Sequence, residues 1–269
     1  FVKNKIRGEF ILKFLIVGDV CGRPGREAFR KYVPELKKEH NIDVVVVNGE
    51  NIAGGRGISR KTLDEIYRAG ADIVTSGNHI WDQKEIVSFI DDEPFLIRPA
   101  NYPEGAPGKG YCIYPFKAKN IGVINVSGRT FMPPMDCPFQ KVDEILKEIK
   151  NQCDIILVDI HAEATSEKIA MGFYLDGRVT CVVGTHTHVQ TADNRILPKG
   201  TAYISDLGMV GPYNSSLGIN VNNAIDKFIT CRPVRFEMAE GPNIFSAVVL
   251  ELAEDNSVKS FERILFNEE

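Results

Sequence analysis

The sequence of 269 residues contains no apolar run near the ~20 residues that a membrane-spanning helix needs. Its N-terminal stretch lacks the charged, apolar and small-residue zones of a secretory signal. Its six cysteines lie far apart without a C-x-x-C pair, and a chain of this size does not depend on disulfides. We therefore expect a cytoplasmic protein with reduced cysteines and no membrane partner.

The sequence also lacks an excess of basic residues, because 32 Lys and Arg stand against 36 Asp and Glu. The formal net charge of −4 argues against DNA binding, while RNA binding stays open because a local basic patch is invisible in a sequence. The glycines of GDVCGRPG (18–25) match neither a P-loop nor a G-x-G-x-x-G fingerprint. If the substrate is an anion, a local positive centre must attract it.

Short apolar runs alternate with segments of helical spacing in the N-terminal part of the chain. The runs LKFLIVGDV (12–20), DVVVVNGEN (43–51) and ADIVTSGNH (71–79) predict buried parallel strands. Residues 27–40 and 60–70 between them predict helices. This alternation is typical of an α/β fold.

The remaining chain predicts further strands and helices but no domain boundary. Helices are expected at 80–92 and 140–150, a hairpin at 111–116 and 120–127, strands at 153–163 and 178–188, and an antiparallel pair at 243–252 and 260–266. Because no repeat, linker or charge block separates two units, we expect one domain over residues 12–269. Residues 1–11 are expected to be an extension outside it.

Polar side chains follow the predicted strands within about a residue. They are Asp19, Glu50, Asn51, Asn78, His79, His161, His186 and His188. We expect them to meet at one edge of one sheet, because the loops beyond the carboxyl ends of parallel strands form the ligand crevice. One such histidine alone is more often a hydrogen-bonded core residue than a ligand. Four of the chain's five histidines together with two carboxylates favour a metal centre.

The spacing within GTHTH (184–188) bears on how many ions are held. On a regular strand His186 and His188 would share one face, whereas a turning backbone could direct them to two ions. Imidazole suits Zn, Fe and Mn, and the carboxylate and amide oxygens are ligands that Mn and Fe accept.

The order of five short motifs resembles the calcineurin-like metallophosphoesterases. These motifs are GDVCG (18–22), NGEN (48–51), SGNH (76–79), DIH (159–161) and GTHTH (184–188). The resemblance implies a layered αββα sandwich with mixed sheets.

Two departures from the usual family pattern narrow the resemblance. Cys21 stands where the first motif usually has His, and Gly49-Glu50-Asn51 replaces the usual Gly-Asp. Both are similar to the YmdB-like bacterial branch, in which Glu bridges the metals and the adjacent Asn substitutes for the missing His. The resemblance implies one ion held by Asp19, Glu50, Asn51 and His188, and another held by Glu50, Asn78, His161 and His186. Cys21 as a soft ligand is the alternative to Asn51.

The same resemblance implies a phosphodiesterase that acts on 2′,3′- or 3′,5′-cyclic nucleotides with two iron or manganese ions. Two divalent ions set against Asp19 and Glu50 leave a formal excess of about +2, which would hold a bridging hydroxide and a phosphodiester for in-line attack. His79 is the expected general acid, and the alternative is that it only orients a ligand. Three aspartates near the motifs could anchor histidines by hydrogen bonds or could have only surface or helix-capping roles; they are Asp82, Asp159 and Asp193.

Other functions stay open from the sequence. A phosphomonoesterase or nucleotidase would use the same metals, because both reactions need the same hydroxide and clamp. A regulatory protein that binds a nucleotide without hydrolysing it is a different class, and an RNA-directed nuclease is a further one. A homo-oligomeric assembly is also expected.

Overall fold

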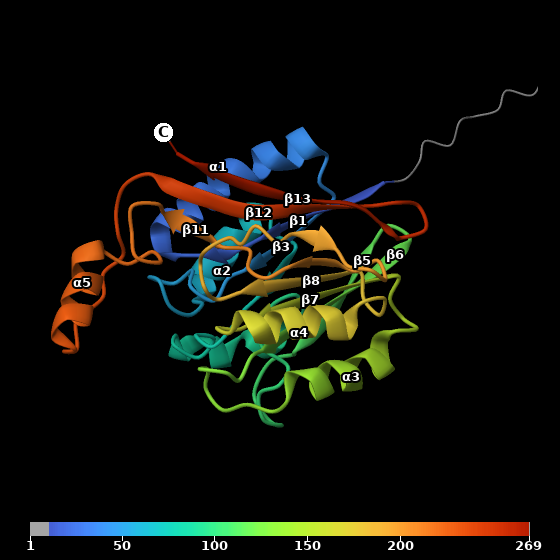
Figure 1. Cartoon of the computed structure of the whole chain (residues 1–269), viewed down its shortest axis with the longest axis horizontal. Coiled ribbons are helices and arrows are strands. Elements are labelled where there is room, and N and C mark those ends of the chain that lie inside the picture. The colour runs from blue at the N-terminus through green and yellow to red at the C-terminus, as the bar shows by residue number, and fades with distance from the viewer. Residues whose placement is uncertain (1–10, 269) are drawn as a thin grey trace, which may run out of the picture.

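A computed structural model describes residues 11–268, so residues 1–10 of the predicted extension lie outside the described residues. Two β-sheets pack face to face, and helices cover the outer face of each one (Figure 1). The expected αββα sandwich is confirmed.

The first sheet is mixed. Its strands in spatial order are β2 (Asp19–Val20), β11 (Met209–Pro212), β12 (Asn243–Leu252), β1 (Leu12–Val17), β3 (Val44–Asn48) and β4 (Ile73–Thr75), and β13 (Val258–Asn267) also pairs with β12. β1, β3 and β4 are parallel, as their apolar runs predicted. β12 runs antiparallel to β1 and to β13, which confirms the predicted C-terminal pair.

The second sheet carries its antiparallel strands at the edges. Its order is β5 (Tyr111–Phe116), β6 (Lys119–Ser127), β7 (Ile155–His161), β8 (Cys181–Thr185), β10 (Ala202–Ile204) and β9 (Arg195–Ile196). β6, β7, β8 and β10 are parallel, while β5 and β9 are antiparallel to their neighbours. The predicted hairpin is therefore the β5–β6 pair.

Successive side chains of a strand point alternately to the core between the two sheets and to the core under the helices. In β1, Phe14 and Ile16 belong to the cluster between the sheets, whereas Leu15 and Val17 belong to the cluster under the helices. The helices α1 (Gly22–His40) and α2 (Arg60–Arg68) pack on the first sheet, and α3 (Pro138–Ile149) and α4 (Thr165–Leu175) pack on the second. Both faces of the strands are thus buried, which explains their continuous apolar runs.

The helix predicted at 80–92 was wrong. This segment forms two short 3₁₀ turns, η1 (Lys84–Ser88) and η2 (Ile90–Asp92). Gln83 is extended with φ −102° and ψ 107°, and Phe89 interrupts the turns with φ −138°, so a continuous α-helix cannot form. Its apolar side chains Ile86 and Ile90 are still buried.

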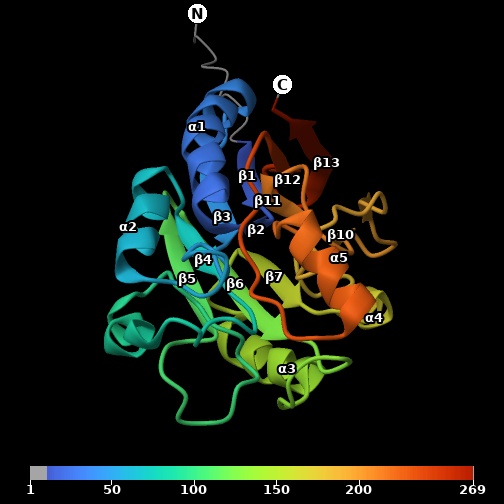
Figure 2. The same cartoon turned by 90° about the vertical axis from the view of Figure 1, so that its left-hand side faces the viewer.

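The helix α5 (Val221–Thr230) lies apart from the layers at one end of the sandwich, as Figure 1 and Figure 2 both show. Among residues 11–268, no helix combines the length and the apolar character that a membrane crossing requires.

Candidate metal centre

All seven residues predicted as metal ligands lie together, but they come from two sheets instead of one. The first sheet supplies Asp19 in β2, Glu50 and Asn51 after β3, and Asn78 after β4. The second sheet supplies His161 at the end of β7 and His186 and His188 after β8. The predicted edge of one sheet is therefore a shared edge of two packed sheets, because β1 to β4 belong to the first sheet and β5 to β10 to the second.

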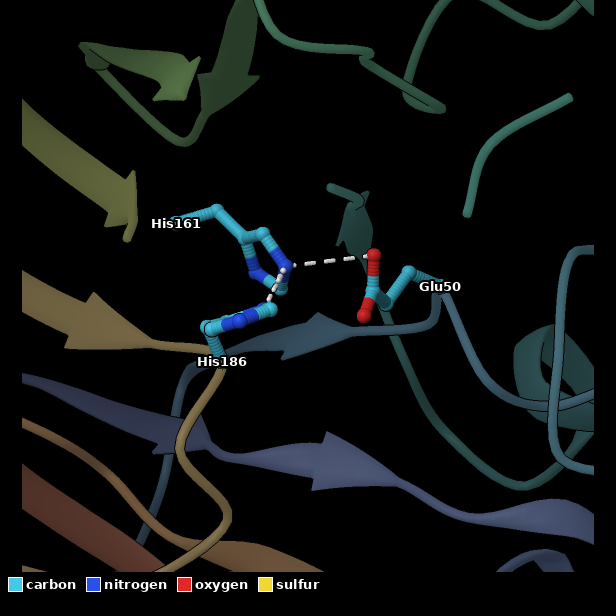
Figure 3. A group of neighbouring side chains, drawn as sticks. All are labelled: Glu50, His161 and His186. Atoms are coloured by element: carbon cyan, nitrogen blue, oxygen red, sulfur yellow. Dashed lines mark hydrogen bonds and ion pairs between the residues drawn. The ribbon is translucent and has the colours of Figure 1, made fainter. Parts of the chain in front are cut away.

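Three side chains converge around the Nε2 atom of His161. Glu50 Oε2 lies 3.2 Å from this atom, Asn78 Oδ1 lies 3.0 Å from it and His186 Nδ1 lies 3.0 Å from it. Figure 3 shows Glu50, His161 and His186 pointing toward one another. Ligand atoms that share a cation at about 2.1 Å lie about 3 to 3.4 Å apart. The spacing of these donors therefore fits a metal ion.

A second group lies on the other side of Glu50. The metal-binding atoms of Asp19, Glu50 and His188 all lie within 4.8 Å of one another. Asn51 Nδ2 lies 3.0 Å from Glu50 Oε1 and 3.2 Å from His188 Nε2. Glu50 thus faces one group with Oε1 and the other with Oε2, which is the arrangement of a bridging carboxylate.

Two oxygens at this second group are buried without a hydrogen-bond partner. They are Asp19 Oδ1 and Asn51 Oδ1, and no partner for either is found in the part of the chain that the structure describes. An unsatisfied buried acceptor is costly, and a cation would satisfy it. Asn51 turns its Nδ2 toward Glu50 and His188, so it becomes a ligand only when rotation of the amide exchanges oxygen and nitrogen. The donor set therefore fits a pair of metal ions.

Cys21 lies behind His188 and outside this group of donors. Its Sγ lies 3.6 Å from His188 Nδ1, which is the ring nitrogen that also lies 3.1 Å from the Leu217 carbonyl oxygen. The other ring nitrogen, Nε2, faces Asn51 and Asp19. The geometry thus favours Asn51 over Cys21 as the ligand next to His188.

The backbone of the GTHTH segment turns at both histidines. His186 has φ 101° and His188 has φ 64°, which are left-handed values that residues with a Cβ rarely adopt. His186 Nδ1 consequently faces His161, while His188 Nε2 faces Asn51. The turning backbone, and not the regular strand, is the arrangement that the structure shows.

Burial and charge set the protonation of the centre. Burial raises the pKa of Asp19 to about 7, although His188 and His161 oppose the shift. Burial also opposes the ionisation of Glu50, but the charge and hydrogen bond of His161 outweigh it and lower the pKa of Glu50 to about 2. Burial and the neighbouring His161 lower the pKa of His186 to about 3, which keeps its imidazole neutral as a ligand must be.

A chain of hydrogen bonds orients His161. Its Nδ1 lies 2.9 Å from Thr185 Oγ1, and the Thr185 hydroxyl donates to Asp159 Oδ1 at 2.8 Å. Nδ1 of His161 therefore keeps a proton toward Thr185, and a bound cation would take the place of the proton on Nε2. Asp159 thus anchors a histidine through Thr185, a residue that we did not identify from the sequence although it lies within the GTHTH motif. Asp193 instead accepts from Ser205 and Thr191.

His79 lies beside the centre and does not join either group of donors. Its backbone N–H donates to Glu50 Oε2 at 3.1 Å, and its Nδ1 lies 2.9 Å from Asp82 Oδ2. Its side chain is 25% exposed, unlike the fully buried His161. His79 is thus oriented by a carboxylate and accessible to a ligand at the centre.

Known proteins resemble this chain over nearly its whole length. The model of the YmdB-like protein family matches residues 15–264. The chain is 52% identical over 260 residues to the 2′,3′-cyclic-nucleotide 2′-phosphodiesterase of Bacillus subtilis, covering 96% of this chain and 98% of that protein. A solved structure described as a novel phosphatase from Mycoplasma pneumoniae is 35% identical with a TM-score of 0.92, covering 97% of this chain and 95% of that one.

A more distant structure shares the fold alone. The NAD nucleotidase of Haemophilus influenzae is 12% identical with a TM-score of 0.61, and the match covers 95% of this chain and 55% of that one. The αββα arrangement is therefore also found within longer nucleotide-hydrolysing chains.

Proposed function

Since the chain belongs to the YmdB-like protein family and is a metal-dependent phosphoesterase, we propose that it hydrolyses cyclic nucleotides at a dinuclear centre. The 2′,3′-cyclic form is the first candidate substrate, because the Bacillus subtilis relative bears that activity in its name. The 3′,5′-cyclic form is the second. The observation that carries the proposal is Glu50, whose two oxygens each face a separate group of donors.

We assign the seven predicted ligands to two ions, iron or manganese. The first ion would be held by Asp19, Glu50, Asn51 and His188, and the second by Glu50, Asn78, His161 and His186. Support comes from the 3.0 to 3.2 Å spacing around His161 Nε2, from the unpartnered oxygen of Asp19 and from the Asn51 amide beside Glu50 and His188. When bound, two such ions supply a nucleophile at neutral pH and charge to neutralise the phosphate.

His79 is the residue that we propose as the general acid. The carboxylate of Asp82 contacts its Nδ1, which leaves Nε2 as the ring nitrogen that would donate a proton to the leaving ribose oxygen. The backbone N–H of His79 is tied to Glu50, which fixes the ring beside the centre. His79 would therefore act on the leaving group and not on the ions.

We also propose that residues 12–269 work as one domain. The group of donors around His161 Nε2 combines Glu50 and Asn78 from the first sheet with His161 and His186 from the second. Neither sheet alone could complete it.

The expected homo-oligomer stays a proposal, supported by the exposed apolar side chains of α5. Phe228 is 81% exposed and Ile229 is 76% exposed, and such neighbours on a surface helix are typical of contact surfaces. Size-exclusion chromatography with light scattering would decide the proposal, and a monomer at micromolar concentration would contradict it.

A substrate panel tests the proposed activity. The Mn²⁺-loaded protein is offered 2′,3′-cyclic AMP, 3′,5′-cyclic AMP, bis-nitrophenyl phosphate and nitrophenyl phosphate. We expect both diester classes to be hydrolysed faster than the monoester. Faster hydrolysis of the monoester would favour a phosphomonoesterase, and binding of cyclic AMP without turnover would favour a regulatory protein.

Matched histidine variants control this panel. His161→Ala removes a side chain at the meeting point of four donors and should reduce diester hydrolysis by about 100-fold or more. His40→Ala removes the one histidine outside the strand-end set, at the end of α1, and should leave the rate unchanged. Equal rates for the two variants would contradict the assignment.

A further inference from the structure

A lysine and an aspartate form an ion pair in the interior, directly behind the histidine turn. Lys168 of α4 is 1% exposed, and its Nζ lies 2.7 Å from Oδ2 of Asp206, which is 0% exposed. Lysine is almost never fully buried, because removal of its charge from water is costly. A buried pair of this kind is weak evidence for stability, which raises the question of a positional role.

Both members of the pair bind the backbone of the turn that carries His186 and His188. Lys168 Nζ donates to the carbonyl oxygen of Thr185 at 3.3 Å. Asp206 Oδ2 accepts from the Thr187 N–H at 3.1 Å, while its Oδ1 accepts from the Gly208 N–H at 2.8 Å. The residues on either side of His186 are therefore attached to the same ion pair.

The lysine stem reaches this position because Gly184 leaves it room. A Cβ on Gly184 would lie 2.6 Å from Lys168 Cδ and 1.9 Å from the Ser205 carbonyl oxygen, so no larger residue fits there. The glycine that precedes the histidine turn therefore lets α4 approach the end of β8 closely.

These hydrogen bonds to the turn matter because its backbone is strained. His186 at φ 101° and His188 at φ 64° flank Thr187, the residue whose N–H is bound by Asp206. The His186 N–H is held from the opposite side by Asp19 Oδ2 at 3.2 Å. Without these contacts, relaxation to an ordinary φ would swing the imidazoles away from their separate groups of donors.

We propose that Lys168 and Asp206 are positioning residues that fix the left-handed turn and so direct His186 and His188 to two different ions. This inference rests on the proposed metal centre, since the two directions matter only if two ions are bound. The competing explanation is that the pair serves only the stability of the fold.

The double variant Lys168→Met/Asp206→Asn separates these explanations. Each substitution keeps the approximate shape of the side chain, and together they leave no unpaired buried charge, whereas Lys168→Met alone would strand Asp206. The control is Lys13→Met/Glu251→Gln, which removes a Lys–carboxylate pair with a 2.8 Å contact between β1 and β12, together with the 2.6 Å contact of Glu251 with Lys259 of β13. Lys13 lies near the start of β1, whose other end leads to Asp19.

Three measurements are made on the metal-free double variant, on the control and on the original protein. They are the thermal unfolding midpoint, the hydrogen-exchange rate of the Thr187 amide by NMR, and Mn²⁺ binding by calorimetry. We expect the double variant to keep a midpoint close to that of the control, to exchange Thr187 about tenfold or more faster, and to bind Mn²⁺ about 10- to 100-fold more weakly.

Unchanged Thr187 exchange and unchanged Mn²⁺ affinity in the double variant would overturn the proposal, as would a lowered midpoint with no change in affinity. If the original protein itself binds no Mn²⁺, the proposed metal centre fails. The Thr187 exchange rate then still decides whether the pair holds the turn, so the two failures are distinguishable.

Discussion

Replacement of His79 by Ala should slow the hydrolysis of esters with basic leaving groups far more than that of activated esters. The ring is held by Asp82 at 2.9 Å through Nδ1 and by its own backbone through Glu50 at 3.1 Å, so the variant removes a positioned proton donor and leaves both groups of metal ligands intact. A general acid contributes about 10²- to 10⁴-fold, which corresponds to about 3 to 5 kcal/mol of transition-state stabilisation.

The assay compares kcat for 2′,3′-cyclic AMP, whose leaving group is a ribose alkoxide, with kcat for bis-nitrophenyl phosphate, whose leaving phenolate needs no proton. We expect a loss of at least about 100-fold on the first substrate and of less than about tenfold on the second. Asp82→Asn keeps the hydrogen bond but removes the charge, so it should show the same selectivity with a smaller loss. An equal loss on both substrates would refute the reasoning, because His79 would then act on binding or on the ions.

Three further predictions concern the metal centre. Asn51→Ala should weaken Mn²⁺ binding, measured by calorimetry, by about 10- to 100-fold, whereas Cys21→Ser should change it by less than about threefold, because Cys21 contacts the Nδ1 side of His188. A larger loss of affinity in Cys21→Ser than in Asn51→Ala would instead identify Cys21 as the ligand. Because burial raises the pKa of Asp19 to about 7 and only the carboxylate binds a cation, Mn²⁺ affinity should fall as the pH is lowered from 8 to 6, and a flat profile would contradict this. Removal of the ions by a chelator should lower the unfolding midpoint by several degrees, because a ligand at 100 times its Kd stabilises by about 2.7 kcal/mol; an unchanged midpoint would argue against bound ions.

The fold was predictable where a local pattern decides it. The apolar runs of 243–252 and 260–266 predicted the β12–β13 pair, and the continuous run at 43–48 predicted the buried strand β3. The segment 80–92 has helical spacing too, yet the extended Gln83 divides it, and that backbone angle is set by contacts that spacing does not reveal. Local patterns therefore predicted the strands better than this segment.

The residues of the site could be predicted from the sequence, but the sheets that supply them could not. Asp19, Glu50, His161 and the others could be grouped because each follows an apolar run. Their division between two sheets could not, because strand pairing depends on contacts distant in the sequence. Lys168 was missed for a related reason, since a lysine in a helix ordinarily lies at the surface and only the fold shows its burial against Asp206.

Anomalous diffraction from crystals of the Mn²⁺-loaded protein would show whether Glu50 bridges two metal ions. We expect two anomalous peaks, one beside each carboxylate oxygen of Glu50. The first should be in contact with Asp19 and His188, and the second in contact with His161 and His186. A single peak, or two peaks that do not share Glu50, would show that Glu50 is not a bridging ligand.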